Sequence, residues 1–399
     1  MNSKLFIIIL VFIIGFIIYN NQNICEGNTV YTDIFDRNIQ HKNMWFSNND
    51  IQISNIINIR NLHGYILPHA GTKYTGKIIS ETLQFKPSKF FDKVYIVYYP
   101  SGKKENINNK YYHEYYVPFM SLKYVIHKYW NIKHKIKFIK IDLRNDKKIN
   151  ELVLENALVI LSIDFSHHLN LITALKLEDK AAHSLMSRNL EDNQYNKIID
   201  DKISLEYLYN YINNNYQFQW VGRTRSPGLK GVGYLSFLLR KTNNTKKIDG
   251  YYVTVYDKNM NSRECLGKYD NHKRNLSKFI EEVIHKAKTT SRLTGGEHLN
   301  IPLITYSITY LHEEKHKNFK RGYHAIQMKN GALYLPDVFL ENTYDNGTWI
   351  NKNKDTKWEY GDFNLQPTLN HLNRKGNTNI SDYILYATTV VYYDIKKGI

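Results

Sequence analysis

The chain has 399 residues, of which 42% are hydrophobic, enough to bury a core for two domains or for one large domain with an appendage. Its formal net charge is +17, but the lysines are scattered through every segment, which predicts a solvated basic surface and no specific nucleic-acid partner. With two cysteines, Cys25 and Cys265, and no C-x-x-C motif, the sequence excludes a cysteine-based zinc site and a disulfide framework.

The N-terminus begins with an apolar stretch that Lys4 precedes and Tyr19 closes. Residues 5–19 would form a helix of about 22 Å, short against the roughly 30 Å hydrocarbon core of a bilayer. No small-residue cleavage site follows, so residues 1–20 are predicted to be an uncleaved signal-anchor in the membrane, with a cleaved signal peptide as the alternative. The positive charge before the stretch predicts a single-pass topology with a cytoplasmic N-terminus and a luminal or extracytoplasmic body.

Strands and helices are predicted to alternate after an Asn-rich tether at residues 21–60. Short apolar runs predict strands, and longer amphipathic segments between them predict helices. The strands are expected at residues 64–67, 93–98, 137–141, 157–163 and 251–256, and the helices at 75–83, 120–130, 174–188, 204–213 and 233–241. This order predicts an α/β domain over residues 61–260, with a parallel or mixed sheet flanked by helices.

A second, smaller domain is predicted for residues 271–399, after a polar segment near residues 257–275. A helix is expected first, then a strand, a hairpin around Asn330-Gly331 and a last strand. Their expected bounds are 276–287, 301–311, 323–335 and 383–393. We therefore predict an α+β unit.

Two of the predicted strands end in polar clusters. His69 follows an apolar run, and Asp164, His167 and His168 follow the run that ends in Ser162 and Ile163. The carboxyl edge of an open α/β sheet is where ligands bind, so one shared pocket is expected. His69, Asp164 and His167 could act there as an acid–base set. Alternatively, Asp164 caps the following helix and His69 satisfies buried backbone groups.

The same clusters carry a resemblance to a known family. Residues 67–76, which read L-P-H-A-G-T-K-Y-T-G, resemble the P-H-A-G-Y-x-Y-x-G signature of the Memo family, and residues 162–168 are similar to its S-S-D-[FL]-[SC]-H segment. Asp179-Lys180 and Gly222-Arg223 stand where that family has a D-x-x-A-like helix and a C-G-R turn. The resemblance covers residues 60–260 and implies a fold related to the class III extradiol dioxygenases.

The second unit resembles, more faintly, an AMMECR-type domain. Residues 321–326 and 331–338 are similar to its G-x-H-G-[IL] and L-L-P-x-V patterns, and residues 369–376 to its K-A-G helix. The R-G-C-I-G segment of that family has no counterpart, so the resemblance implies a truncated domain.

The Memo resemblance implies a redox-metal site that is largely lost. Its ligands would be His69, a histidine where this chain has Gly102, and a cysteine where it has Val221. His69 is thus the only candidate ligand in register, and no cofactor is expected. The leading hypothesis is a membrane-anchored, degenerate Memo-like binding or structural module with an unknown protein partner, a pseudoenzyme. The alternative is an enzyme with iron- or copper-dependent, dioxygenase-like redox chemistry, or acid–base chemistry, at His69, Asp164 and His167.

Overall fold

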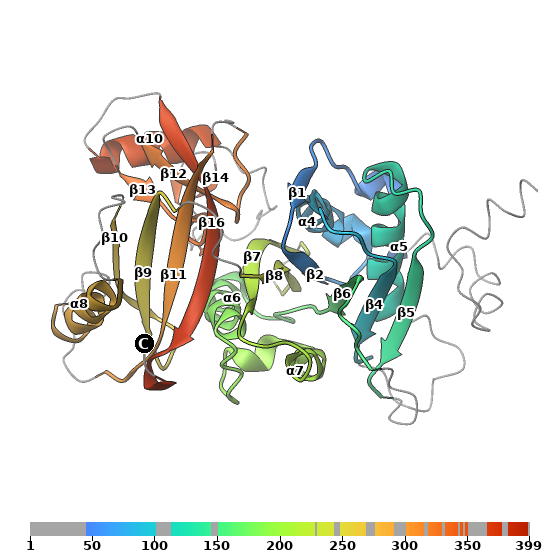
Figure 1. Ribbon diagram of the computed structural model, residues 1–399, viewed down its shortest axis with the longest axis horizontal. Helices are drawn as coiled ribbons and strands as arrows, with labels where there is room; N and C mark the ends of the chain where they lie inside the picture. The colour runs from blue at the N-terminus through green and yellow to red at the C-terminus, as the bar shows by residue number, and fades with distance from the viewer. Residues whose placement is uncertain are drawn as a thin grey trace, which may run out of the picture.

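A computed structural model of the protein shows two units side by side, each built around its own sheet (Figure 1). The structure describes residues 45–100, 113–144, 151–227, 230–242, 248–268, 276–290, 301–314, 318–328, 332–341, 344–345, 348–349, 365–376 and 382–397.

The first unit holds a six-stranded mixed sheet in the order β5-β4-β6-β2-β8-β7. Its strands are β2 (Leu62–Leu67), β4 (Lys93–Tyr98), β5 (Lys137–Asp142), β6 (Ala157–Ser162), β7 (Tyr216–Arg225) and β8 (Gly233–Lys241). The strands β5, β4, β6 and β2 run parallel, whereas β8 and β7 add antiparallel pairs. A short parallel pair is formed by β1 (Ile57–Ile59) and β3 (Phe85–Pro87).

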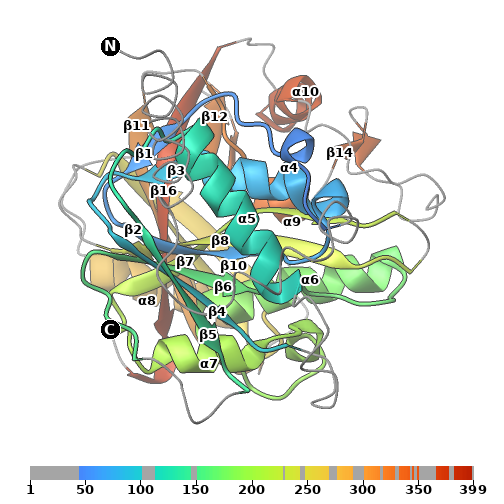
Figure 2. The same ribbon diagram turned by 90° about the vertical axis from the view of Figure 1, so that its right-hand side faces the viewer.

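Helices cover both faces of this sheet, which confirms the α/β prediction (Figure 2). They are α4 (Thr72–Leu83) and α5 (His113–Lys128) on one face, and α6 (Leu171–Met186) and α7 (Lys202–Tyr209) on the other. The alternation of strand side chains explains the three layers. In β2, Ile66 belongs to the core under α6 and α7, whereas Tyr65 and Leu67 belong to the core under α4 and α5. Each such fully buried side chain stabilises the fold by roughly 1.5–3 kcal/mol.

The second unit is an antiparallel sheet in the order β10-β9-β11-β16-β12-β13. Its strands are β9 (Gly250–Asp257), β10 (Ser262–Lys268), β11 (Leu303–Glu314), β12 (His324–Met328), β13 (Leu333–Tyr334) and β16 (Tyr383–Asp394). Its helices are α8 (Leu276–Thr289), α9 (Val338–Glu341) and α10 (Leu365–Gly376), and the strands β14 (Tyr344–Asp345) and β15 (Thr348–Trp349) form a separate pair. Short 3₁₀ helices lie at Asn48–Asp50, Asn196–Ile198 and Ile395–Lys397.

The structure differs from the predicted elements in three places. Residues 233–241, predicted as a helix, are strand β8, and β7 was not predicted. Residues 251–256, predicted within the first domain, form β9, which pairs with β11 in the second sheet. An apolar run that is buried on both faces has no period to distinguish helix from strand, and no local pattern names a strand's partner.

The membrane prediction requires a correction. Within the part of the chain that the structure describes, no helix is long and apolar enough to cross a membrane. At 16 residues each, α5 and α6 would span about 24 Å, and both carry charged residues. The proposed signal-anchor at residues 1–20 lies outside the described residues. We therefore withdraw the single-pass topology, the membrane contact through residues 5–19 and the extracytoplasmic body.

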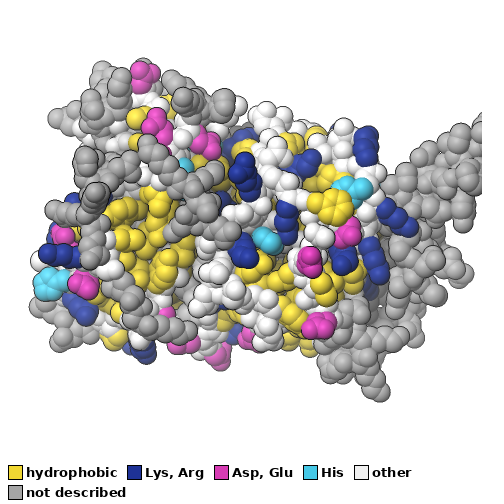
Figure 3. All heavy atoms as spheres, in the orientation of Figure 1, with side chains coloured by type: hydrophobic (Ala, Val, Ile, Leu, Met, Phe, Trp, Pro, Cys, Tyr) yellow, Lys and Arg dark blue, Asp and Glu magenta, His cyan; other side chains and the backbone are white. Residues whose placement is uncertain are grey.

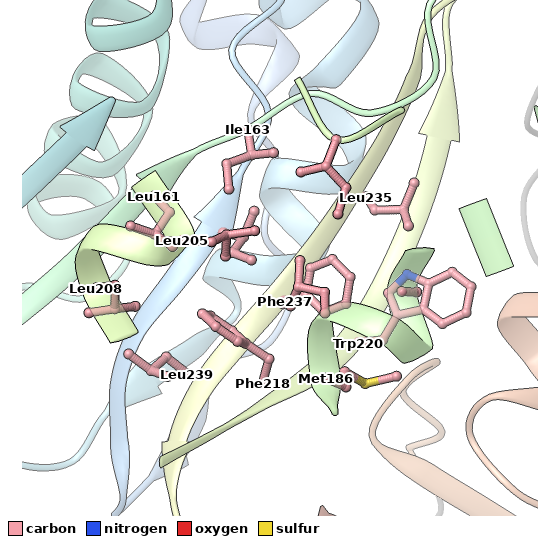
Figure 4. Close-up of a cluster of buried hydrophobic side chains, with 14 of the residues drawn as sticks. Leu161, Ile163, Met186, Leu205, Leu208, Phe218, Trp220, Leu235, Phe237 and Leu239 are labelled. Atoms are coloured by element: carbon pink, nitrogen blue, oxygen red, sulfur yellow. The ribbon is translucent and has the colours of Figure 1, made fainter. Parts of the chain in front are cut away.

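The two units share buried apolar clusters. Lys and Arg side chains gather where the two halves meet (Figure 3). Between the two units, Arg321 forms a 3.2 Å ion pair with Glu81 of α4. Beneath the surface, Met186 and Trp220 lie among the apolar side chains between the first sheet and α6 (Figure 4), and the same cluster includes Tyr256 and Tyr392 of the second sheet. Tyr323 and Ala387 of the second unit belong to the cluster on the α4 and α5 side. The second unit therefore packs beside β7 and contacts the cores on both faces of the first sheet.

Candidate metal site

Parallel pairing of β2 and β6 brings the two predicted polar clusters together. Leu67 is the register partner of Ser162, and the Ile163 N–H donates to the Leu67 carbonyl at 3.0 Å. His69 and Asp164 therefore leave the sheet at the same edge, as parallel strands require. A third group, Asp200, reaches this edge from the turn that precedes α7. His69 and Asp164 are 6% and 3% exposed, so the site is almost closed to water on their side.

Both carboxylates are held by backbone hydrogen bonds. The His69 N–H donates to Oδ1 of Asp164 at 2.9 Å, and the Asp164 N–H donates to Oδ1 of Asp200 at 3.0 Å. The remaining oxygens face the His69 ring: Oδ2 of Asp164 lies 3.6 Å from Nε2, and Oδ2 of Asp200 lies 3.3 Å from it. His69, Asp164 and Asp200 each offer one ligand atom, and these three atoms all lie within 4.8 Å of one another.

The His69 ring has a defined tautomer. Its Nδ1 lies 3.1 Å from Oγ of Ser162, and that hydroxyl donates to the Glu114 carbonyl. Because the hydroxyl proton is already committed, Nδ1 carries a proton and donates it to Oγ. Nε2 therefore directs either a lone pair or a proton at the two carboxylate oxygens. Only a proton or a metal ion between these atoms makes the arrangement favourable.

The ionisation of the site follows from burial and mutual attraction. Burial alone would lower the pKa of His69, but the charges of Asp164, Asp200 and Glu114 and the hydrogen bond to Asp200 together raise it to about 10. Burial raises the pKa of Asp164 to about 6, although His69 opposes the shift. For Asp200 the charges of His69 and His167 outweigh burial and lower the pKa. Without a metal ion, His69 would thus hold a proton at neutral pH.

His167 lies at the open side of the site. Its Nε2 is 3.8 Å from Oδ2 of Asp200, the oxygen that also faces His69, and its side chain is 43% exposed. The two imidazoles are thus within the reach of a common ligand. The hydrogen bond to Asp200 raises the pKa of His167. Its neighbour His168 is exposed, with a φ of 56°, and contributes no atom to the group around Asp200.

A second histidine borders the buried side. The His113 ring, at the start of α5, lies 5.2 Å from the His69 ring and is stacked on Trp45 at 4.5 Å. Burial lowers the pKa of His113, although the charge of Glu114, 3.4 Å away, opposes the shift. Burial therefore favours the neutral form of the His113 ring beside the site.

Neither of the other two predicted ligand positions contributes to this group. Gly102 lies outside the described residues. Val221 is buried in β7 beside Gly322 of the second unit. Gly322 has a φ of 74°, and a side chain at that position would collide with the Val221 carbonyl. Asp200, which the sequence prediction missed, joins His69 instead. The acidic pair Asp200-Asp201 is typical of a helix start, since Asp201 is an N-cap residue, but it does not indicate that Asp200 reaches His69.

A buried ion network supports the loop that carries Asp164 and His167. Glu178 of α6 lies 3.6 Å from Nη1 of Arg223 and 3.7 Å from Nη1 of Arg225, and it accepts a hydrogen bond from Ser166. The two residues singled out by the Memo resemblance, Asp179 and Arg223, form an ion pair of 2.7 Å within it. These residues position the loop between β6 and α6 but do not themselves face His69.

Comparison with known proteins finds no family model that matches the chain and no similar curated protein.

Proposed function

We propose that the protein binds one divalent first-row metal ion between His69, Asp164 and Asp200, with His167 as a further ligand, and that it is a metal-dependent enzyme. The observation that carries this proposal is the group of three ligand atoms within 4.8 Å, in which His69 and Asp164 are buried and Asp200 lies on the more open side. The first unit would then be a Memo-like domain whose metal ligands differ from those of the family, followed by an AMMECR-like unit.

The donor set suits such an ion. Two imidazoles and carboxylates bind iron(II), manganese(II) and zinc(II), and two histidines with one carboxylate are the ligands of non-haem iron oxygenases. The supporting contacts are also those of a metal site, because the Nδ1–H of His69 donates to Ser162 and each carboxylate accepts a backbone N–H. With iron bound, the site would supply oxygen-dependent oxidation of a small substrate, the chemistry that the extradiol resemblance implies.

The protein groups around the ion would bind and move protons. His167, on the open side, stands where a substrate would approach. Burial favours the neutral form of His113, and its ring lies close to His69, so it can take a proton from a substrate hydroxyl. The carboxylate of Asp164, buried against the His69 imidazole with Asp200 beside it on the more open side, is costly to desolvate, and a binding module without turnover has no use for it. This cost favours the enzyme over the degenerate module.

Metal analysis tests the proposal. The purified protein is stripped with a chelator and reloaded with iron(II) under nitrogen, or with manganese, zinc or copper, and bound metal is measured by mass spectrometry. We expect about one equivalent in the parent protein and much less in Asp200→Asn and His69→Gln, because affinity comes from several ligands together. Oxygen uptake with catechols should require the iron-loaded form.

The matched control is His168→Asn, which removes the neighbouring imidazole and tolerates the left-handed backbone. It should load like the parent. A parent protein that takes up no stoichiometric metal, or variants that all load equally, would exclude the metal centre. Catalysis of proton transfer without metal would then favour the acid–base alternative, and no activity would favour the binding module.

A further inference from the structure

A basic cluster occupies the opposite edge of the first sheet from the proposed metal site. His63 lies at the start of β2, Lys241 at the end of β8, and Lys89 in the segment before β4. The Lys89 ammonium donates to Nδ1 of His63 at 2.8 Å and to the Ala157 carbonyl at 3.1 Å. The Tyr216 ring lies between His63 and Lys241. It contacts the His63 ring edge-on at 5.0 Å, and the Lys241 ammonium lies 5.7 Å from its centroid.

No acid balances these three groups among the residues that the structure describes: none of His63, Lys89 and Lys241 has a carboxylate within ion-pair distance. Burial and repulsion from neighbouring cations both act on the ionisation of His63 and Lys89. Burial, then Lys89 and Lys241, lower the pKa of His63 to about 4, and burial, then Lys241, lower the pKa of Lys89 to about 8. Half-buried like charges raise the free energy of the folded protein unless an anion lies between them.

We propose that His63, Lys89 and Lys241 form an oxyanion site that binds phosphate or a phosphate monoester. The three groups come from three separate segments and are linked through the Lys89–His63 hydrogen bond and the Tyr216 ring. Three donors suit an anion with three acceptor oxygens better than a carboxylate with two. Lysine ammonium groups serve as point charges for phosphate. This site is independent of the proposed metal centre, because it uses other residues at the other ends of the strands.

Binding of the anion has a second consequence. Its charge offsets the burial and repulsion that keep His63 neutral, so Nδ1 of His63 takes up a proton when the site fills, and the Lys89 ammonium turns the N–H that it gave to Nδ1 towards the anion. The groups that face His63 are Lys89, Lys241 and the Tyr216 ring, and none of them can supply that stabilisation. Phosphate should therefore raise the pKa of His63, a change confined to this one imidazole.

Calorimetry with inorganic phosphate and with glycerol phosphate, together with NMR titration of the His63 ring, tests the proposal on the full chain. We expect saturable binding of one anion and an upward shift of the His63 pKa. The variant Lys89→Met should weaken binding about tenfold or more, since it removes a charge-assisted donor. Tighter binding of the ester would show that the site takes a substituted phosphate.

The matched control is Lys137→Met, which removes the same charge from an exposed lysine at the start of β5, at the same edge of the sheet. It should bind phosphate like the parent. Equal weakening in both variants would show an adventitious ion only and overturn the proposal. So would phosphate binding that leaves the His63 pKa unchanged, or no saturable binding at all.

Discussion

Replacing Glu178 with leucine should lower the free energy of unfolding by about 3–5 kcal/mol, because it leaves the buried Arg225 without its carboxylate and Arg223 with Asp179 alone. Glu178 and Arg223 are each 1% exposed, and Arg225 is 9% exposed. The substitution takes the shared carboxylate from both guanidinium groups, which lie 3.6 and 3.7 Å from it. It also removes the acceptor of the Ser166 hydroxyl. Replacing all three charged residues, as Glu178→Leu with Arg223→Met and Arg225→Met, should recover much of the loss.

Urea denaturation followed by circular dichroism measures the effect, and the midpoint should fall by about 1 M or more. The control is Glu282→Leu, which breaks an exposed ion pair of 3.5 Å with Lys286 on α8. That change should cost about 0.5 kcal/mol or less, because water already solvates both charges. If Glu178→Leu were as mild as the control, the carboxylate would not be holding the two arginines, and the account of the loop's support would be wrong.

Three further changes test other parts of the structure. Ser162→Ala should weaken metal binding by about 10–100-fold without unfolding the protein, because it removes the hydrogen bond that supports the His69 ring. Chelator competition measures the affinity, and an unchanged value would count against the site. Gly233→Ala should cost about 1–3 kcal/mol in urea denaturation, because its Cβ would lie 1.9 Å from Oε1 of Glu178, and a neutral result would contradict that approach. The pKa of His63 is lowered to about 4 in the folded protein, so between about pH 6.5 and pH 4 the unfolded chain binds a proton that the folded protein does not. The free energy of unfolding should therefore fall as the pH drops through this range. His63→Gln should flatten that part of the stability curve, measured by thermal unfolding without phosphate, and an unchanged slope would refute the assignment.

Elements with a clear local pattern were predicted from the sequence, and those fixed by distant partners were not. The strand at residues 93–98 has the predicted bounds, because charged and turn residues limit a short apolar run there. Strand β8 was mistaken for a helix, since its buried residues Tyr234 to Leu239 face apolar neighbours on both sides. The place of β9 in the second sheet depends on pairing with β11, which begins 46 residues after Asp257. Nothing within the β9 sequence indicates that partner.

Part of the candidate site could also be predicted from the sequence. His69, Asp164 and His167 follow the ends of two neighbouring parallel strands, so their proximity could be expected. Asp200 could not, because it reaches the site from the turn before α7, and its hydrogen bond to the Asp164 N–H joins segments that are 36 residues apart. Comparison with the ligand positions of the Memo family therefore identified His69 as the only candidate ligand. In the structure, Asp164 and Asp200 lie beside it, and Asp200 comes from a segment that carries no family motif.

The proton on His69 makes metal binding depend on pH in a way that distinguishes this site from a surface cluster of carboxylates. The metal-free protein holds that proton with a pKa of about 10, because Asp164, Asp200 and Glu114 together outweigh burial. A metal ion needs the bare Nε2 lone pair and must displace the proton. Below that pKa, apparent affinity should therefore rise about tenfold for each pH unit, or roughly 100-fold between about pH 6.5 and about pH 8.5. Chelator-buffered zinc titrations would measure the slope. His69→Gln should abolish it along with tight binding, whereas a parent protein whose affinity is flat across this range would show that the ion does not bind at Nε2 of His69.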